Sequence, residues 1–153
     1  MVRVGDPAPD FSARDDAGNV VRLADLRGRR VVLYFYPKDD TPGCIKEACS
    51  FRDAMGRLRQ AGAVVLGVSP DGVESHRRFK DKYGLDFPLV ADEDHALAEA
   101  YGAWVEKNLY GRRTWGTARM TFLIGPDGRV EHVWQKVDPE GHAEEVLAVL
   151  QRG

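Results

Sequence analysis

Two cysteines stand close together in a segment whose residue types suit thiol chemistry. The segment reads PKDDTPGCIKEAC, and Cys44 and Cys49 are the two cysteines of the 153-residue chain. The dipeptide Thr41-Pro42 is typical of a helix start, with threonine as the N-cap and proline in the first turn. Cys44 is therefore expected in the first turn of a helix. There, free backbone N–H groups and the positive end of the helix dipole favour a thiolate, which is the nucleophilic form.

Cys49 lies five residues further along the same predicted helix, beyond the first-turn N–H groups. One thiol is therefore activated and the other is ordinary. On ideal helix geometry the two α-carbons are about 8.7 Å apart, beyond the roughly 7 Å limit for a disulfide. An intact helix forbids the bond, so oxidation to a disulfide would require the first turns to unwind.

Other interpretations of the pair remain open on the residues alone. Free cysteine is often an inert buried residue. A zinc site is disfavoured because the C-x4-C spacing has no second cysteine pair to complete it. The pair could also exchange disulfides with other proteins, although the short C-x-x-C loop is missing, or it could switch the shape of a redox-sensing binding protein. The four histidines are scattered over several predicted elements: His76, His95, His132 and His142.

Apolar runs and helical periodicities alternate along the chain, and this alternation predicts an α/β fold. A mixed central sheet with helices on both faces and an N-terminal hairpin is compatible with a thioredoxin-like fold. The cysteine segment follows a buried strand, at the edge of the sheet where ligand chemistry concentrates in α/β folds. The predicted strands are 30–36, 63–69, 87–91, 120–124 and 130–135, the hairpin lies within 10–22, and the helices are about 42–60, 73–83, 94–101 and 141–151.

The two loop acids, one of the histidines and the segment 102–117 can also be interpreted from the sequence. Asp39 and Asp40 are interpreted as solvated loop carboxylates, because acids near a thiol oppose its ionisation. His76 falls on the apolar side of its helix and is expected to be a partly buried structural histidine. Residues 102–117 are predicted to be a long structureless loop that walls a pocket, docks a partner or packs its aromatic side chains on the sheet edge.

Composition restricts the function classes. The chain is 43% apolar and 30% charged, which is typical of one globular domain, here residues 1–153. The net charge of −2 gives no general attraction for nucleic acid or an anionic membrane. No apolar run reaches the length of a membrane span or a signal peptide, so we expect a cytoplasmic protein.

At the level of motifs, the chain resembles the peroxiredoxins. Pro37, Thr41 and Cys44 match their P-x-x-x-T-x-x-C motif, and Cys49 stands where the bacterioferritin-comigratory, or peroxiredoxin Q, branch has a second cysteine. The stretches YGAWVEK at 101–107 and RMTFLI at 119–124 also resemble that branch, so the similarity covers nearly the whole chain. Asp39 and Asp40 fill variable motif positions, and Val105 replaces an expected glycine.

The resemblance implies a role for each matching residue. Cys44 would be the peroxidatic nucleophile and Cys49 the resolving thiol, joined during turnover by an intramolecular disulfide. Thr41 would hydrogen-bond the sulfur and the peroxide, Pro37 would shield the site from water, and Arg119 would place a guanidinium over the thiolate. The implied activity is reduction of hydrogen peroxide and organic hydroperoxides in antioxidant defence. Thioredoxin or a similar dithiol protein would recycle the enzyme, with no cofactor and with a monomer as the default.

Overall fold

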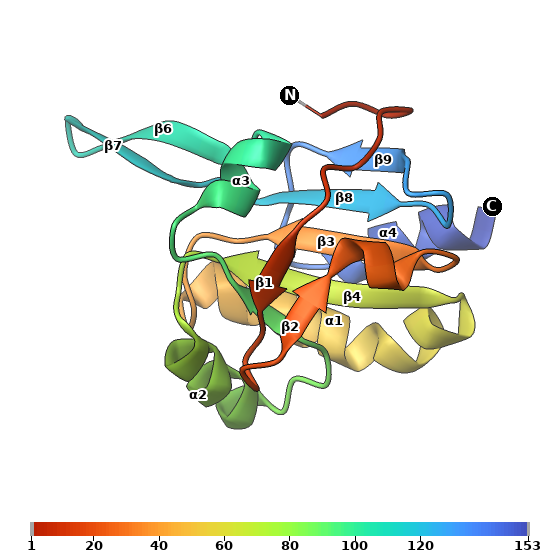
Figure 1. Ribbon diagram of the computed structural model, residues 1–153. Helices are drawn as coiled ribbons and strands as arrows, with labels where there is room; N and C mark the ends of the chain where they lie inside the picture. Colours follow the sequence, from red (N-terminus) through yellow and green to blue (C-terminus); the bar gives the residue numbers. More distant parts are fainter. Residues whose placement is uncertain (1, 153) are drawn as a thin grey trace.

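A five-stranded mixed sheet forms the centre of the computed structural model, which describes residues 2–152 (Figure 1). Strand β3 (Arg30–Phe35) lies in the middle because its apolar run is buried on both faces. On one side β4 (Ala63–Ser69) and then β5 (Leu89–Ala91) run parallel to it. On the other side β8 (Met120–Ile124) and β9 (Val130–Trp134) are antiparallel. The predicted mixed sheet is confirmed.

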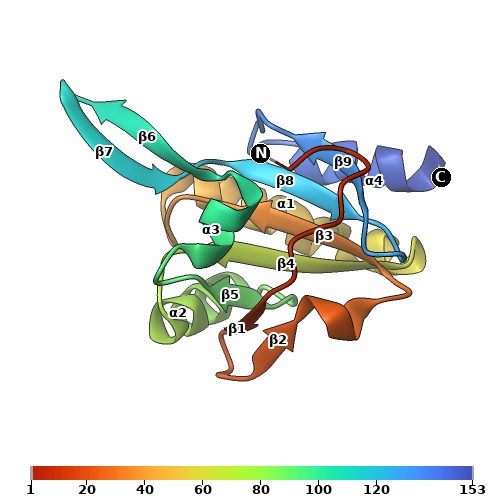
Figure 2. The ribbon, with the colours of Figure 1, turned by 45° about the horizontal axis from the view of Figure 1, so that its top comes forward.

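Helices cover both faces of this sheet, as the sequence predicted (Figure 2). The helices α1 (Pro42–Gln60) and α4 (His142–Arg152) pack together against one face. The short helix α3 (Ala96–Tyr101) and the 3-10 helix η1 (Leu23–Leu26) cover the other. Helix α2 (Val73–Tyr83) lies beside β5 at the sheet edge and adds an apolar side chain to the core under α1.

Side chains as well as apolar packing join α1 to α4. Arg57 of α1 forms an ion pair with Glu144 of α4. The Ser50 hydroxyl oxygen accepts a hydrogen bond of 3.3 Å from the backbone N–H of Ala143, at the start of α4. The fully buried Phe51 ring packs nearly perpendicular to the His142 ring, with 5.7 Å between centroids. The middle of α1 is therefore fixed to α4 from Ser50 onward.

The N-terminal hairpin consists of β1 (Ser12–Arg14) and β2 (Val20–Arg22), and it confirms the predicted hairpin. Its turn is tied to the edge of the central sheet by Asp16, which is only 5% exposed. One Asp16 carboxylate oxygen accepts from the Leu89 backbone N–H at 2.9 Å, and the other pairs with Lys80 of α2 at 2.9 Å.

Residues 102–117 differ from the prediction of a structureless loop. They form a second hairpin, β6 (Trp104–Leu109) and β7 (Arg112–Thr117), which projects from the body of the protein (Figure 1). Tyr110 and Gly111 connect the strands with φ angles of 52° and 79°, the positive values that tight hairpin turns require. The loop prediction was wrong because Tyr-Gly is not a common turn pair and because the strands have little core to produce apolar alternation.

The remaining elements appear where the sequence places them, with small differences at their ends. Helix α1 and strand β4 have the predicted bounds. Strand β5 begins only after Pro88, and helix α3 begins later than predicted because residues 93 and 94 form a turn. Among residues 2–152, no helix is long and apolar enough to cross a membrane.

Candidate active site

Cys44 occupies the first turn of α1, as predicted, and its side chain is 1% exposed. Thr41, the N-cap, has an extended backbone with φ −102° and ψ 153°, and Pro42 begins the helix. The Thr41 hydroxyl does not cap the helix. It donates instead to the Lys38 carbonyl at 2.8 Å, which closes the turn that leads from β3 into α1.

Arg119 reaches the Cys44 sulfur from the segment between β7 and β8. Its Nη2 lies 3.4 Å from Cys44 Sγ, and its Nη1 donates to Glu47 Oε1 at 2.6 Å. Although burial lowers the pKa of Arg119, the negative charges of Glu47 and Cys44 hold that pKa above its ordinary value. The sequence-predicted pair of Cys44 and Arg119 is therefore together in space, 75 residues apart along the chain.

Gly43 explains how the guanidinium approaches so closely. A β-carbon at position 43 would lie 3.0 Å from Arg119 Nη2 and 3.6 Å from the ring of Pro139. The distance to Pro139 is an ordinary van der Waals contact, but the distance to Arg119 is too short and would push the guanidinium away from its place beside Cys44. Glycine beside the nucleophile therefore leaves room for the arginine.

Glu47 is a site residue that the sequence analysis missed. It is fully buried, and burial raises its pKa to about 7 against the opposing charge of Arg119. Its Oε2 has no hydrogen-bond partner within residues 2–152. A signal was available in the sequence, because Glu47 follows Cys44 by three residues and so shares its helix face with the apolar Ala48 and Phe51.

Cys49 is half-buried on the same uninterrupted helix, and both cysteines are free thiols. A regular helix holds α-carbons at this spacing about 8.7 Å apart, too far for a disulfide. Pro37 is half-buried and lies two residues after the end of β3, on the segment that leads to Thr41.

Lys107, on the projecting hairpin, is a second residue that the analysis missed. Its ammonium donates to the Thr117 carbonyl at 2.7 Å. Burial, and after it the positive charge of Arg119, lower the pKa of Lys107, while the charge of Cys44 acts in the opposite direction. The base of the hairpin therefore adds a second cation to the surroundings of the sulfur.

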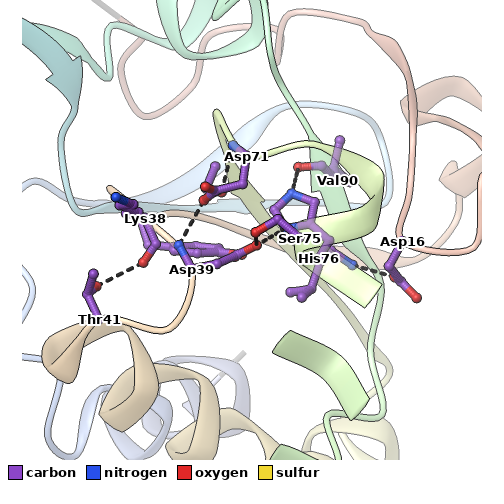
Figure 3. Close-up of polar contacts among 11 residues, drawn as sticks. Asp16, Lys38, Asp39, Thr41, Asp71, Ser75, His76 and Val90 are labelled. Atoms are coloured by element: carbon purple, nitrogen blue, oxygen red, sulfur yellow. Dashed lines mark hydrogen bonds and ion pairs between the residues drawn. The ribbon is translucent and has the colours of Figure 1, made fainter. Parts of the chain in front are cut away.

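The expectation that Asp39 is solvated is wrong. Asp39 is 7% exposed, and its carboxylate accepts hydrogen bonds from Tyr36, Ser75 and His76 (Figure 3). His76 is fully buried, more so than expected. Asp40 is exposed but pairs with Lys82 and Tyr83 at 2.9 Å each. The turn after β3 bends back onto α2, and this contact places both acids against donors.

The histidines do not form a metal centre in the part of the chain that the structure describes. Between residues 2 and 152 there is no group of three or more histidine, cysteine, aspartate or glutamate side chains that could hold a metal ion. Each histidine has another contact: His76 with Asp39, His95 with Trp104, His132 with Trp134 and His142 with Thr121.

Comparison with known proteins gives similarities along nearly the full chain. A family model described as the AhpC/TSA family matches residues 4–133. A Coxiella burnetii protein named as a peroxiredoxin is 50% identical over 149 residues, which cover 97% of this chain and 99% of that protein. Peroxiredoxin Bcp of Bacillus subtilis is 45% identical over 150 residues, covering 98% and 96%.

Solved structures give the same result. A variant of Xylella fastidiosa PrxQ superposes with a TM-score of 0.94 at 39% identity, covering 99% of this chain and 97% of its own. Xanthomonas campestris peroxiredoxin Q has a TM-score of 0.91 at 41% identity, covering 99% and 96%. A further Xanthomonas campestris structure concerns alkyl peroxide reduction by its bacterioferritin comigratory protein.

The fold and the buried thiol beside a guanidinium are those of a thiol-dependent peroxidase, and the chain belongs to the AhpC/TSA family. Within that family it is a peroxiredoxin of the bacterioferritin-comigratory, or peroxiredoxin Q, type. The resemblance found in the sequence and the thioredoxin-like fold are confirmed.

Proposed function

We propose that Cys44 is the nucleophile of this peroxidase and that its thiolate attacks one oxygen of a hydroperoxide. The carrying observation is the Cys44 sulfur in the first turn of α1, 3.4 Å from the Arg119 guanidinium. In the attack the S–O bond forms as the O–O bond breaks. Cys44 becomes a sulfenic acid, and the leaving oxygen takes up a proton and departs as water or an alcohol.

Arg119 has two tasks in this step. Its positive charge favours the Cys44 thiolate, and its N–H groups stabilise the negative charge that develops on the leaving oxygen. Glu47 supports both tasks, because its bond to Nη1 fixes the guanidinium plane and leaves Nη2 directed at the sulfur.

Thr41 binds the substrate, and Pro37 protects the site from water. The Thr41 hydroxyl proton is engaged by the Lys38 carbonyl. Its oxygen is therefore left as an acceptor, the role needed to hold the O–H of a bound hydroperoxide. Pro37 has no N–H and is half-buried beside this turn, which suits it to limiting the access of water to Cys44.

Cys49 resolves the sulfenic acid. Its thiol attacks the Cys44 sulfur, water leaves, and a disulfide forms within one chain. Because α1 is continuous and both thiols are free, the first turns must unwind before this step. A dithiol protein such as thioredoxin then supplies two electrons by disulfide exchange and restores both thiols.

The substrates we propose are hydrogen peroxide and organic hydroperoxides, in antioxidant defence and without a bound cofactor. Reduction of alkyl peroxides by the Xanthomonas campestris relative supports the organic class. An intramolecular disulfide needs no second subunit, which supports a monomer built as one domain, residues 1–153. The recycling step needs a reducing compartment, which supports the cytoplasm.

Peroxide consumption coupled to a thioredoxin system tests these assignments. Wild type should turn over, and Cys44→Ser should be inactive because a serine hydroxyl stays protonated. Turnover by Cys44→Ser near the wild-type rate would refute the assignment of the nucleophile. Stopped-flow oxidation by peroxide separates the peroxidase from a protein disulfide oxidoreductase, and sustained turnover separates it from a redox-sensing binding protein.

A further inference from the structure

The turn that leads to Thr41 and Cys44 is held in place by a largely buried polar cluster (Figure 3). Asp39 Oδ1 accepts from the Tyr36 hydroxyl at 2.6 Å, and Oδ2 accepts from the Ser75 hydroxyl at 2.8 Å. The Asp39 backbone N–H donates to Asp71 at 2.8 Å. The side chain of Asp39 is therefore bonded to α2 and to Tyr36 at the start of the same connection, and its backbone is bonded to the segment between β4 and α2.

His76 completes the cluster from α2. Its Nε2 lies 2.9 Å from the Val90 carbonyl oxygen, which only accepts, so Nε2 carries a hydrogen. Its Nδ1 lies 2.7 Å from Asp39 Oδ2, a distance at which two lone pairs would repel, so one proton lies between these atoms. The pair has no net charge in either arrangement of that proton, which makes its burial compatible with stability.

A second contact holds the next residue of the turn. Asp40 has φ 58°, a conformation that few residues other than glycine adopt. Its carboxylate bonds to Lys82 and Tyr83, at the other end of α2. Helix α2 therefore forms hydrogen bonds with two successive residues of the turn, and Thr41 follows them directly.

We propose that Asp39, held by His76 and Ser75, is a positioning residue for the peroxide step. It touches neither sulfur nor substrate. It fixes the turn so that the Thr41 hydroxyl and the first turn of α1 stand in reacting geometry around Cys44. A displacement of about 1 Å in such a site costs up to about a hundredfold in rate. This inference rests on the proposed roles of Thr41 and Cys44.

The test compares two substitutions of the same residue by stopped-flow oxidation of Cys44 with hydrogen peroxide. Asp39→Ala removes the acceptors for Tyr36, Ser75 and His76, and we expect oxidation to slow by about tenfold or more. Asp39→Asn has the same shape, and its amide can donate to Nδ1 of a neutral His76 while Nε2 still donates to Val90. We therefore expect Asp39→Asn to recover to within about threefold of wild type.

Alkylation of Cys44 by iodoacetamide at the same pH is the second readout, since that reaction does not use Thr41. A positioning role slows peroxide oxidation more than alkylation. If both reactions in Asp39→Ala stay within about twofold of wild type, or if both fall equally, the proposal is wrong.

If Asp39→Ala does not fold, the variant His76→Gln tests the proposal instead. Its amide group is too short to reach both partners of the histidine ring, so it can hydrogen-bond either Asp39 or the Val90 carbonyl but not both. Oxidation slower than wild type by at least about threefold supports the proposal, and an unchanged rate overturns it.

Asp16→Ala is the matched control. Asp16 is as buried as Asp39 and also anchors α2, through Lys80, but it does not contact the turn between β3 and α1. It should lower stability and leave peroxide oxidation within about twofold of wild type. An equal slowing in both aspartate variants would show that α2 acts only through overall stability. Cys44→Ser in the same series distinguishes failure of the proposed function from failure of this inference. If Cys44→Ser is oxidised like wild type, the assignment of the nucleophile is wrong. If Cys44→Ser is inactive and Asp39→Ala is fully active, only the positioning role of Asp39 is refuted.

Discussion

Replacing Glu47 with glutamine should change how stability depends on pH. The pKa of this buried carboxyl is raised from 4.5 to about 7 by burial, against the opposing charge of Arg119. Between these values the folded protein keeps a proton that the unfolded chain has lost. Stability therefore falls as pH rises through the window, by about 3 kcal/mol in total for the single group.

The glutamine side chain in Glu47→Gln has nearly the same shape as glutamate but does not titrate, so this variant should not lose stability as pH rises through the window. We expect the two proteins to be similar below the window, and the variant to be more stable above it by up to about 3 kcal/mol. Urea unfolding at about pH 4, below the window, and at about pH 8, above it, measures the difference, since all other titrating groups are common to both proteins. Both should carry Cys44→Ser, so that ionisation of the neighbouring thiol does not contribute.

A stability difference that is the same at both pH values would refute the reasoning. It would mean that the bond from Arg119 at 2.6 Å keeps Glu47 ionised throughout, and that burial does not control its protonation. The guanidinium would then face the sulfur as half of an ion pair at every pH.

Three further predictions concern the reaction. Arg119→Ala should move the pH profile of Cys44 alkylation upward and slow peroxide oxidation by about a hundredfold, because the cation 3.4 Å from the sulfur is lost; an unchanged profile would place Arg119 outside the chemistry. Cys49→Ser should leave the first oxidation intact but stop thioredoxin-linked turnover, and mass spectrometry should find one added oxygen on Cys44. Oxygen on Cys49 of Cys44→Ser protein, gained at a comparable rate, would reverse the roles. Disulfide formation should remove about two turns of helical circular dichroism and speed amide exchange from Thr41 to Cys49. Equal protection in the reduced and disulfide forms would contradict the unwinding argument.

Local signals in the sequence were enough to place the nucleophile. The Thr41-Pro42 helix start and the apolar periodicity after it predicted α1 with its observed bounds, and with them the position of Cys44. The buried strand before the turn was equally clear, because its apolar run has the composition of a central strand. These features depend on neighbouring residues, which is why the sequence alone determines them.

Contacts between distant residues were not accessible in that way. Arg119 was associated with Cys44 only through the resemblance, since 75 residues separate them. Asp39 was misjudged because its donors Ser75 and His76 lie on another helix, and an acid in a loop is usually solvated. The β6–β7 hairpin was missed because two strands outside the core show no apolar alternation.

The hydrogen bond from Ala143 to Ser50 sets an end point for the conformational change in α1. Unwinding that begins at Thr41 and includes Cys49 would expose the fully buried Cys44, Glu47 and Ala48, but none of the contacts to α4 described above involves these residues. If unwinding continued to Ser50, α4 would lose the hydrogen bond from the Ala143 N–H to the Ser50 hydroxyl. If it continued to Phe51, that fully buried side chain would leave the core. With respect to the proposed disulfide, α1 therefore has two parts: a first part that carries both sulfurs and must unwind, and a longer second part that is held by α4. The boundary between them falls directly after Cys49.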